Sequence, residues 1–257
     1  MKKISKEEIK KIQLEMLSEV DAFCRQHNLK YTLAYGTLIG AIRHKGFIPW
    51  DDDLDICMPY DDMLYLKENL KSENIEIADF DNCPNYNLPF PRIIHKKSYS
   101  RNGKKSVSYG VNIDLYVMIP CTSDVAKYEE IIQKGMVIYK NYHQAFIWSS
   151  RILRYLPVDN DYVLKPFLKK YREFLYDTLQ DKNGQNYFCV ASPLASYKKD
   201  TLKYNLFDHL IESEFENYKF LIPSCYDDYL KQQYGEYMAL PPVDQRVPYH
   251  GGDYYWK

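Results

Sequence analysis

Several features that would place this chain in a familiar class are missing from it. Its six cysteines have no C-x-x-C spacing and no pairing pattern, which argues against a disulfide framework and a zinc site. They are Cys24, Cys57, Cys83, Cys121, Cys189 and Cys225. The basic N-terminus is followed by no apolar segment, and no run approaches about 18 apolar residues, so neither a signal peptide nor a membrane span is predicted. We therefore expect a cytoplasmic protein.

The chain also lacks an excess of charge and any internal repeat. With 34 basic and 35 acidic residues its net charge is −1, which provides no basic field for binding nucleic acid. A length of 257 residues fits one large domain, or one domain with a sizeable addition. A capping box at Ser5–Glu8 and apolar spacing predict a helix to about His27. Residues 124–180 read as mostly helical, with interruptions near Pro157 and Lys165-Pro166.

What the chain does have is an acidic cluster between a Pro-Trp pair and an apolar run. Its members are Asp51, Asp52, Asp53 and Asp55. Carboxylates among core residues are costly unless a cation or a proton neutralises them. If residues 53–56 form a strand, Asp53 and Asp55 share one face, roughly 7 Å apart at their Cα atoms, and can bind one hard cation. Asp51 has the same parity, whereas Asp52 is expected to face away. We predict a magnesium site for phosphate chemistry, with manganese as the alternative ion.

Two groups upstream of the acids are suited to phosphate. The Gly36-Thr37 turn is predicted to join a strand at 31–35 to a helix at 38–44, where free N–H groups and the Thr37 hydroxyl can hold an anion. Many such glycines serve the backbone only. A compact basic group follows and consists of Arg43, His44 and Lys45. Each alone is typical of a solvated helix end. Beside an acidic metal site, the three together are interpreted as phosphate ligands.

The strongest strand pattern in the chain covers residues 111–119 and is expected to end at Pro120. Asp114 lies inside it and shares a face with Asn112 and Tyr116. A neighbouring strand can bring such a residue within about 5 Å of a cross-strand partner. Asp114 is thus a candidate third carboxylate of the metal cluster, or a general base. A buried aspartate that only accepts local backbone hydrogen bonds is the structural alternative.

A glycine turn, an Asp-x-Asp strand and a third acid on a later strand form the pattern of the nucleotidyltransferase fold related to DNA polymerase β. We therefore predict an α+β fold, with a mixed-sheet core of that type and additional helices packed around it. Residues 1–124 are expected to form the catalytic core. Residues 125–257 are expected to supply a helical region and a C-terminal tail that completes the site.

Residues 34–59, AYGTLIGAIRHKGFIPWDDDLDICMP, resemble the signature of LicD-type phosphotransferases, which are distantly related to fukutin and fukutin-related protein. The similarity extends to HNLKY, to VNIDLYV and to the C-terminal YLKQQYGEYMALPP with Arg246 and His250 beyond it. The resemblance aligns the metal-binding aspartates of the family with Asp51, Asp53 and Asp55, and its later acid with Asp114. On this reading Asp53, Asp55 and Asp114 are the catalytic residues.

The resemblance implies transfer of a phospho-alcohol from a CDP-activated donor to a sugar hydroxyl. Phosphocholine is the leading candidate, with ribitol-, glycerol- and ethanolamine-phosphate as alternatives. The acceptor is expected to be a bacterial surface glycan or lipid-linked oligosaccharide, such as teichoic acid, capsule or lipopolysaccharide, with peripheral membrane association through it. The predicted substrate-binding residues are Tyr35, Gly36, Thr37, Arg43, His44, Lys45, Trp50, Arg92, Arg246 and His250. Among them, Trp50 and Tyr35 are candidates for contacting a choline group, as are the C-terminal aromatic residues.

Two other functions fit parts of the pattern. A true nucleotidyltransferase would share the fold but transfer a nucleotide to a small molecule or sugar hydroxyl and release pyrophosphate. A non-catalytic protein could bind a divalent cation with the acidic cluster alone. The second reading lacks the ligand spacing and mid-loop glycine of an EF-hand, and it leaves the Gly36-Thr37 turn unexplained.

Overall fold

The structure is a computed structural model that describes residues 2–79, 81–83, 86, 88–100, 109–121, 124–152, 160–174, 186–189, 197–247 and 253–257. Its helices in this part of the chain are α1 (Lys6–His27), α2 (Tyr35–Ile39), the π-helical η1 (Gly40–His44), α3 (Tyr60–Asn69), α4 (Val125–Ile152), α5 (Asn160–Glu173), α6 (Tyr197–Asp200), α7 (Tyr226–Tyr234) and the 3₁₀-helical η5 (Val243–Gln245). No helix among these residues is long and apolar enough to span a membrane.

A mixed β-sheet forms the centre of the molecule. Its strands run in the order β1 (Thr32–Leu33), β2 (Asp55–Pro59), β6 (Asn112–Cys121), β4 (Arg92–His95) and β3 (Ile75–Ala78). The far end of β6 also pairs with β7 (Asn186–Cys189), which pairs with β8 (Thr201–Leu202). Only β2 and β6 are parallel, and the other neighbours in this sheet are antiparallel. The predicted mixed sheet with helices around it is confirmed.

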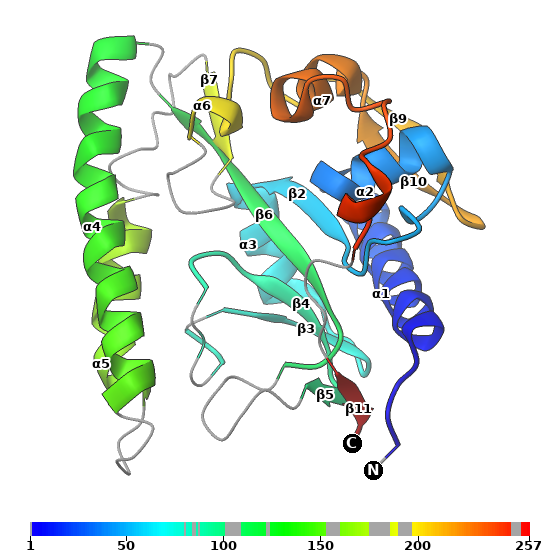
Figure 1. The fold of residues 1–257 in the computed structure, drawn as a ribbon, viewed down its shortest axis with the longest axis horizontal. Helices are drawn as coiled ribbons and strands as arrows, with labels where there is room; N and C mark the ends of the chain where they lie inside the picture. Colours follow the sequence, from blue (N-terminus) through cyan, green and yellow to red (C-terminus); the bar gives the residue numbers. More distant parts are fainter. Residues whose placement is uncertain are drawn as a thin grey trace.

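Two small antiparallel ribbons complete the strands. One is the hairpin β9 (Leu210–Phe215) and β10 (Tyr218–Pro223). The other joins β5 (Ser98–Ser100) to β11 (Tyr254–Trp256), so the C-terminus returns to the sheet region. Lys3 also bridges to Tyr255, which brings the two ends of the chain side by side, as Figure 1 shows. Segments from both predicted halves therefore share one sheet, and the boundary at residue 124 stays a prediction.

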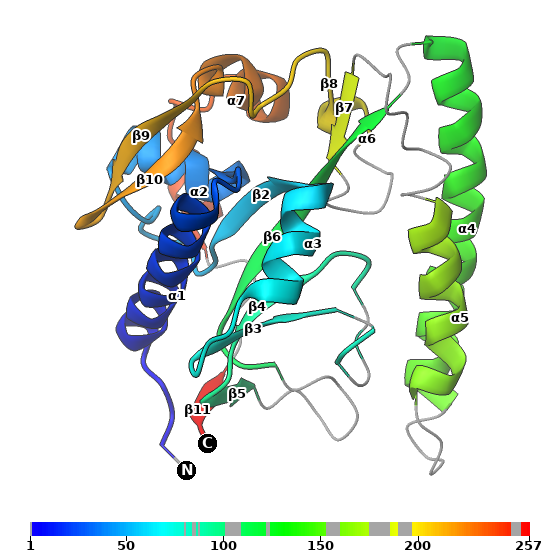
Figure 2. The same cartoon turned by 180° about the vertical axis from the view of Figure 1, so that it is seen from behind.

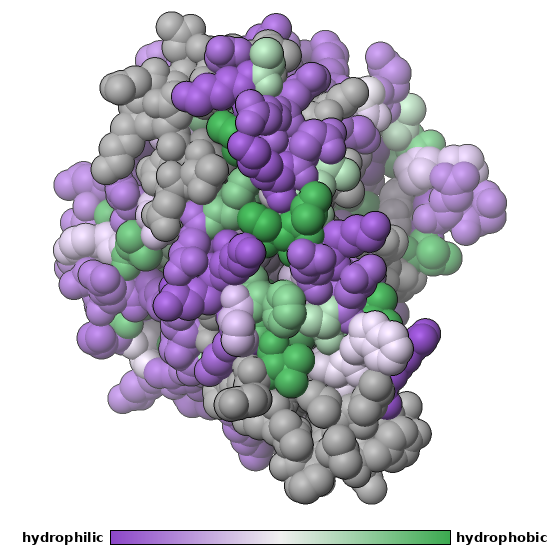
Figure 3. Space-filling model, turned by 90° about the vertical axis from the view of Figure 1, so that its left-hand side faces the viewer, coloured by the Kyte–Doolittle hydropathy of each residue, from purple (hydrophilic) through white to green (hydrophobic). Residues whose placement is uncertain are grey.

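The helices lie in distinct places around the sheet. Helices α1 and α3 cover one face, which Figure 2 shows from their side. Helix α2 and helix α7 lie on the opposite side of β2 (Figure 1). The antiparallel pair α4 and α5 stands beside the sheet, where its inner side packs on Ile94, Tyr86 and Tyr109. Its outer side is mostly hydrophilic, with hydrophobic atoms gathered near the centre of the view in Figure 3.

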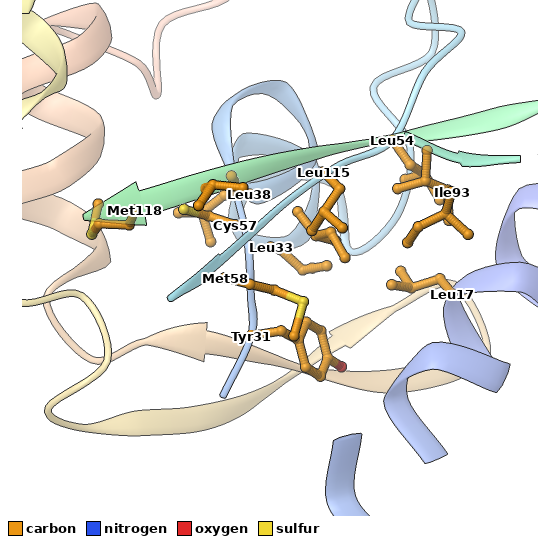
Figure 4. Packing of buried hydrophobic residues seen from close by; sticks show 14 of the residues in the cluster. Leu17, Tyr31, Leu33, Leu38, Leu54, Cys57, Met58, Ile93, Leu115 and Met118 are labelled. Atoms are coloured by element: carbon orange, nitrogen blue, oxygen red, sulfur yellow. The ribbon is translucent and has the colours of Figure 1, made fainter. Parts of the chain in front are cut away.

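The core explains why these segments form these elements. Helix α1 begins at the predicted capping box, in which the Glu8 N–H donates to Ser5 and the Ser5 N–H donates to Glu8. Its apolar positions, including Leu17 and Val20, are fully buried. Figure 4 shows Leu17 beneath Ile93 and Leu115 of the sheet. An amphipathic helix is held mainly by burying such a stripe, at about 25 cal/mol per Å² of apolar area.

Two expected element boundaries within the catalytic half are wrong. The strand that was expected at residues 53–56 begins at Asp55, so Asp53 precedes it. The first strand is only Thr32–Leu33, and Tyr35 already starts α2 with φ of 44°. The Asp55 N–H donates to the Thr37 hydroxyl and the Ala34 N–H donates to the Asp55 carbonyl, and these contacts between the two segments outweigh local strand propensity.

Two prolines do not end their elements as expected. Strand β6 continues through Pro120 to Cys121, where its neighbour is β7. Its pairing with β2 stops at Met118, so a missing N–H is tolerated on this one-sided stretch. Helix α5 continues through the exposed Pro166, because the buried Leu164 and Leu168 hold it against α4. The interruption expected near Pro157 lies outside the described residues.

Candidate active site

The acidic cluster lies in the loop that leads into β2. The Asp51 N–H donates to the Ile48 carbonyl at 2.9 Å, which turns the chain after Pro49. Oxygen atoms of Asp51, Asp52 and Asp53 all lie within 4.8 Å of one another. Asp52 was expected to face away, and this expectation is wrong because the segment is a loop in which strand alternation does not apply. Three adjacent carboxylates therefore converge on one small volume.

Asp55 and Asp114 extend this cluster along the sheet. They are direct partners in the parallel pair of β2 and β6, and the Asp114 N–H donates to the Leu54 carbonyl at 2.9 Å. Both side chains are buried, with 7% and 6% of their surface exposed. The Asp55 Oδ1 atom is buried without a hydrogen-bond partner among the described residues. Such an orphaned oxygen is costly unless a cation or a proton completes it.

The electrostatics of the cluster show that its charges repel. Burial raises the pKa of Asp55 well above its ordinary value, and the negative charges of Asp53, Asp114 and Asp51 raise it further. Burial raises the pKa of Asp51 to about 7, again with a contribution from Asp53. A divalent cation at this position would replace the protons that otherwise neutralise these carboxyls. The carboxylate set is also the ligand type that Mg²⁺ prefers.

Arg92 is held by the acid that faces it. It is the direct partner of Asp114 across the antiparallel pair of β4 and β6. Its Nε lies 2.6 Å from Asp114 Oδ1, and its Nη2 donates to Asp114 Oδ2 at 3.1 Å. Burial alone lowers the pKa of Arg92, yet the Asp114 carboxylate raises it above the ordinary value. The structure pairs Arg92 with Asp114, and the predicted contact of Arg92 with substrate stays a prediction.

Gly36 and Thr37 shape the acidic site through α2. The Thr37 hydroxyl is buried and accepts the Asp55 N–H at 2.7 Å, which fixes the start of β2. A Cβ atom at Gly36 would lie 2.8 Å from Asp51 Oδ2, so any larger residue there would displace the Asp51 carboxylate from its position. Both residues therefore touch the acidic loop or strand directly. A contact of either one with phosphate stays a prediction.

The three residues of the basic group have different contacts, some with the C-terminal tail and some with the loop next to the aspartates. The Arg43 guanidinium donates to the Tyr237 and Ala239 carbonyls, and its Nε lies 2.9 Å from the His44 ring. His44 faces Trp50, with ring centroids 6.1 Å apart. The exposed Lys45 has a left-handed backbone with φ of 59° and ends η1. Arg43 therefore fastens the C-terminal segment beside the acidic loop.

The C-terminal tail reaches the site at two points. The Arg246 guanidinium lies over the Trp50 ring, 5.4 Å from its centroid, while its Nε donates to the Pro241 carbonyl. The Tyr254 hydroxyl donates to Asn112, whose amide donates to Asp114 at 3.2 Å. The tail therefore contacts both the loop next to the aspartates and the strand that carries Asp114. His250 lies outside the described residues.

Sequence patterns did not reveal several residues that support the cluster. Gln13 of α1 is buried and donates to the Asp52 and Asn112 carbonyls. Glu216 accepts the Phe47 N–H from the hairpin tip. Burial lowers the pKa of Lys10, although the negative charges of Asp51 and Glu216 act to raise it. All three residues lie far from the aspartates in the sequence. Among them, only Gln13 was marked by the sequence, because it is a polar residue among the apolar positions of a helix.

The fold and site define a mixed α/β protein with clustered carboxylates at the edge of a parallel strand pair. Residues 28–156 match the family model described as "LicD/FKTN/FKRP, nucleotidyltransferase domain". The chain is 30% identical to the lipopolysaccharide cholinephosphotransferase LicD of Haemophilus influenzae over 270 residues, which cover 97% of each chain. The chain is also 34% identical to the uncharacterised protein RP689 of Rickettsia prowazekii over a shorter stretch of 76 residues. This stretch covers 26% of this chain and 29% of RP689. The chain belongs to the LicD family.

Proposed function

We propose that the protein transfers phosphocholine from CDP-choline to a hydroxyl group of a bacterial surface glycan, in a magnesium-dependent reaction. The observation that carries the proposal is the row of carboxylates in which Asp55 and Asp114 are paired in register beside the 51–53 loop. The full-length similarity to a lipopolysaccharide cholinephosphotransferase supports the transferred group and the class of acceptor. A nucleotidyltransferase-like core is part of the same proposal.

The residues present fit a divalent cation. Asp51, Asp53 and Asp55 would hold it, because the orphaned Asp55 oxygen and the mutual repulsion of these carboxylates both call for positive charge. When bound, magnesium supplies charge neutralisation to the phosphates of the donor, and manganese can replace it. The alternative of a non-catalytic cation site predicts the same binding without turnover.

The reaction that this site would support is an in-line displacement at phosphorus. The acceptor hydroxyl oxygen forms a new bond to the phosphorus of the phosphocholine group, the pyrophosphate P–O bond breaks, and CMP leaves with the electron pair. The hydroxyl proton passes to a carboxylate of the cluster. The Arg92 ion pair stabilises the anionic form of Asp114, which favours a role in binding the cation over a role as base. We propose Asp114 first as a ligand of the cation and second as the general base.

Donor binding is assigned to the groups around Trp50. Arg246 offers a planar guanidinium suited to phosphate, next to the indole ring. Arg43, His44 and Lys45 are proposed as further phosphate ligands, of which His44 faces the same indole ring and Arg43 also anchors the tail. The acceptor would reach the site on its carrier, with the enzyme at the membrane surface in the cytoplasm. The cytoplasmic location is inferred from the sequence, in which the six cysteines are scattered and show no pairing pattern.

Product analysis tests the proposal against nucleotidyl transfer, which the description of the family model also suggests. Purified enzyme is incubated with acceptor glycan, Mg²⁺ and either choline-labelled CDP-choline or CTP. We expect CMP release and labelled glycan from CDP-choline, and no pyrophosphate from CTP. Pyrophosphate release with nucleotide on the acceptor would establish the nucleotidyltransferase instead. Cation binding without any turnover of either donor would leave only the metal-binding function.

A further inference from the structure

Aromatic rings line the sheet directly beyond the catalytic carboxylates. Tyr116 follows Asp114 by two positions on β6 and therefore points to the same face, roughly 7 Å further along the strand. The Tyr35 ring meets the Tyr116 ring edge-on, with centroids 4.8 Å apart. Phe90 lies against Tyr116 at 5.0 Å. Tyr35 and Tyr116 are both partly exposed, so this aromatic wall is accessible next to the acidic site.

A buried carboxylate stands at one end of the wall. Asp200, at the end of α6, has 4% of its surface exposed. Its Oδ1 accepts the Tyr35 hydroxyl at 3.0 Å and the Gln233 amide at 3.2 Å. The neighbouring Lys199 ammonium donates to the Gln233 carbonyl at 2.8 Å. Asp200 is thus held by two donors, and its carboxylate lies at the hydroxyl end of the Tyr35 side chain.

We infer that Tyr35, Tyr116 and Asp200 bind the trimethylammonium group of the donor while its phosphate lies at the aspartate cluster. This inference rests on the proposed function and adds the residues that select the alcohol. A quaternary ammonium has no N–H to donate, so aromatic rings and a nearby carboxylate are the groups that recognise it. The two-carbon linker of phosphocholine can span the distance between successive same-face residues of β6. Ribitol and glycerol would instead need hydrogen-bonding partners for their hydroxyl groups.

Calorimetry with CDP-choline, CDP-glycerol and CDP, each with Mg²⁺, tests the inference. In Tyr116→Leu and in Asp200→Asn we expect the Kd for CDP-choline to rise about 5- to 30-fold. The Kd values for CDP-glycerol and CDP should change less than about 2-fold, well below that effect. Asp200→Asn keeps an oxygen that can accept from Tyr35, so it removes the charge with little change in contacts.

Two matched variants separate recognition from folding. Tyr116→Phe keeps the ring and should retain the preference for CDP-choline. Tyr218→Leu removes an exposed tyrosine of the β9–β10 hairpin, outside the wall, and should leave all three Kd values unchanged. Equal weakening of all three ligands in Tyr116→Leu and Asp200→Asn, or no weakening, would overturn the inference. So would a wild-type protein that binds CDP-choline no better than CDP. The CMP-release assay decides the proposed function independently of these binding values.

Discussion

The two parts of the carboxylate row differ in how their charge is balanced. Asp114 is matched by Arg92, with 2.6 Å between Oδ1 and Nε, and both groups are largely buried. Asp51 and Asp55 are surrounded instead by other acids, and their pKa values are raised. The first part is stable as folded, because a buried charge is tolerated when it is paired. The second holds repulsion that a cation or protons must relieve.

This difference indicates where function costs stability. A fold that needed only structural integrity would replace the acids at 51–55 by neutral residues, whereas a phosphate-transfer site needs them charged and close. The Arg92–Asp114 pair borders the strained region and fixes one wall of it. Substitutions in each part can therefore separate the contribution to activity from the contribution to stability.

Replacing a cluster acid should abolish turnover without harming the fold. We expect Asp55→Asn or Asp53→Asn to lower kcat by at least about 10³-fold at saturating Mg²⁺, because under the proposed function each removes a carboxylate charge that would hold the cation at the donor phosphate. The melting temperature of the metal-free protein should stay the same or rise, since carboxylate repulsion is reduced. Rates are measured by CMP release and stability by thermal unfolding. Near-normal rates in both variants would refute the cation assignment.

Breaking the balanced pair should act mainly on stability. Arg92→Met is expected to lower the free energy of unfolding by about 3–5 kcal/mol, because it leaves the buried Asp114 without its cation. Urea unfolding measures the loss. The double variant with Asp114→Asn should recover part of it, because the uncompensated charge is gone. A double variant that is no more stable than Arg92→Met would show that the pair is not the source of the effect.

The repulsion among the carboxylates around Asp51 and Asp55 should make the metal-free protein lose stability as the pH rises. The pKa values of both Asp51 and Asp55 are raised in the folded state, that of Asp51 to about 7, so the folded protein binds more protons than the unfolded chain above the ordinary value of 3.8. Stability from Asp51 is therefore complete below about pH 4 and is lost as the pH rises through about 7, by roughly 1–3 kcal/mol.

Urea unfolding across this pH range with EDTA, and again with Mg²⁺, measures the effect. Magnesium should restore stability above pH 7, because it binds only the charged carboxylates of the folded state. Asp51→Asn should flatten the pH dependence of the metal-free protein. An unchanged slope in that variant would contradict the assignment of the shift to Asp51.

A change in the scaffold should have the smallest effect. Thr37→Val removes the hydroxyl that accepts the buried Asp55 N–H, and we expect a loss of about 1–2 kcal/mol in the free energy of unfolding. Thr37→Ser keeps the acceptor oxygen and serves as the control. If the two variants lose stability equally, the hydrogen bond to Asp55 contributes little.

Much of the fold could be predicted from local sequence. The α1 capping box and the strand that carries Asp114 both depend on patterns within a few neighbouring residues. The predictions failed where distant contacts fix the backbone, as at Tyr35 and in the loop containing Asp52. The supporting role of Gln13 could not be predicted, because its carbonyl partners belong to residues 39 and 99 positions away.

Local sequence patterns were sufficient to mark the candidate residues for the chemistry: acids within an apolar stretch, a glycine before them and a further acid in a strand. These signals are local, because a charge in a core segment is costly wherever that segment folds. The pairing of Arg92 with Asp114, and the contact of Asp200 with Tyr35 across 165 positions of chain, could be found only in the folded molecule. Such pairings depend on strand register and helix docking, which are set by burying the whole core and not by any single segment.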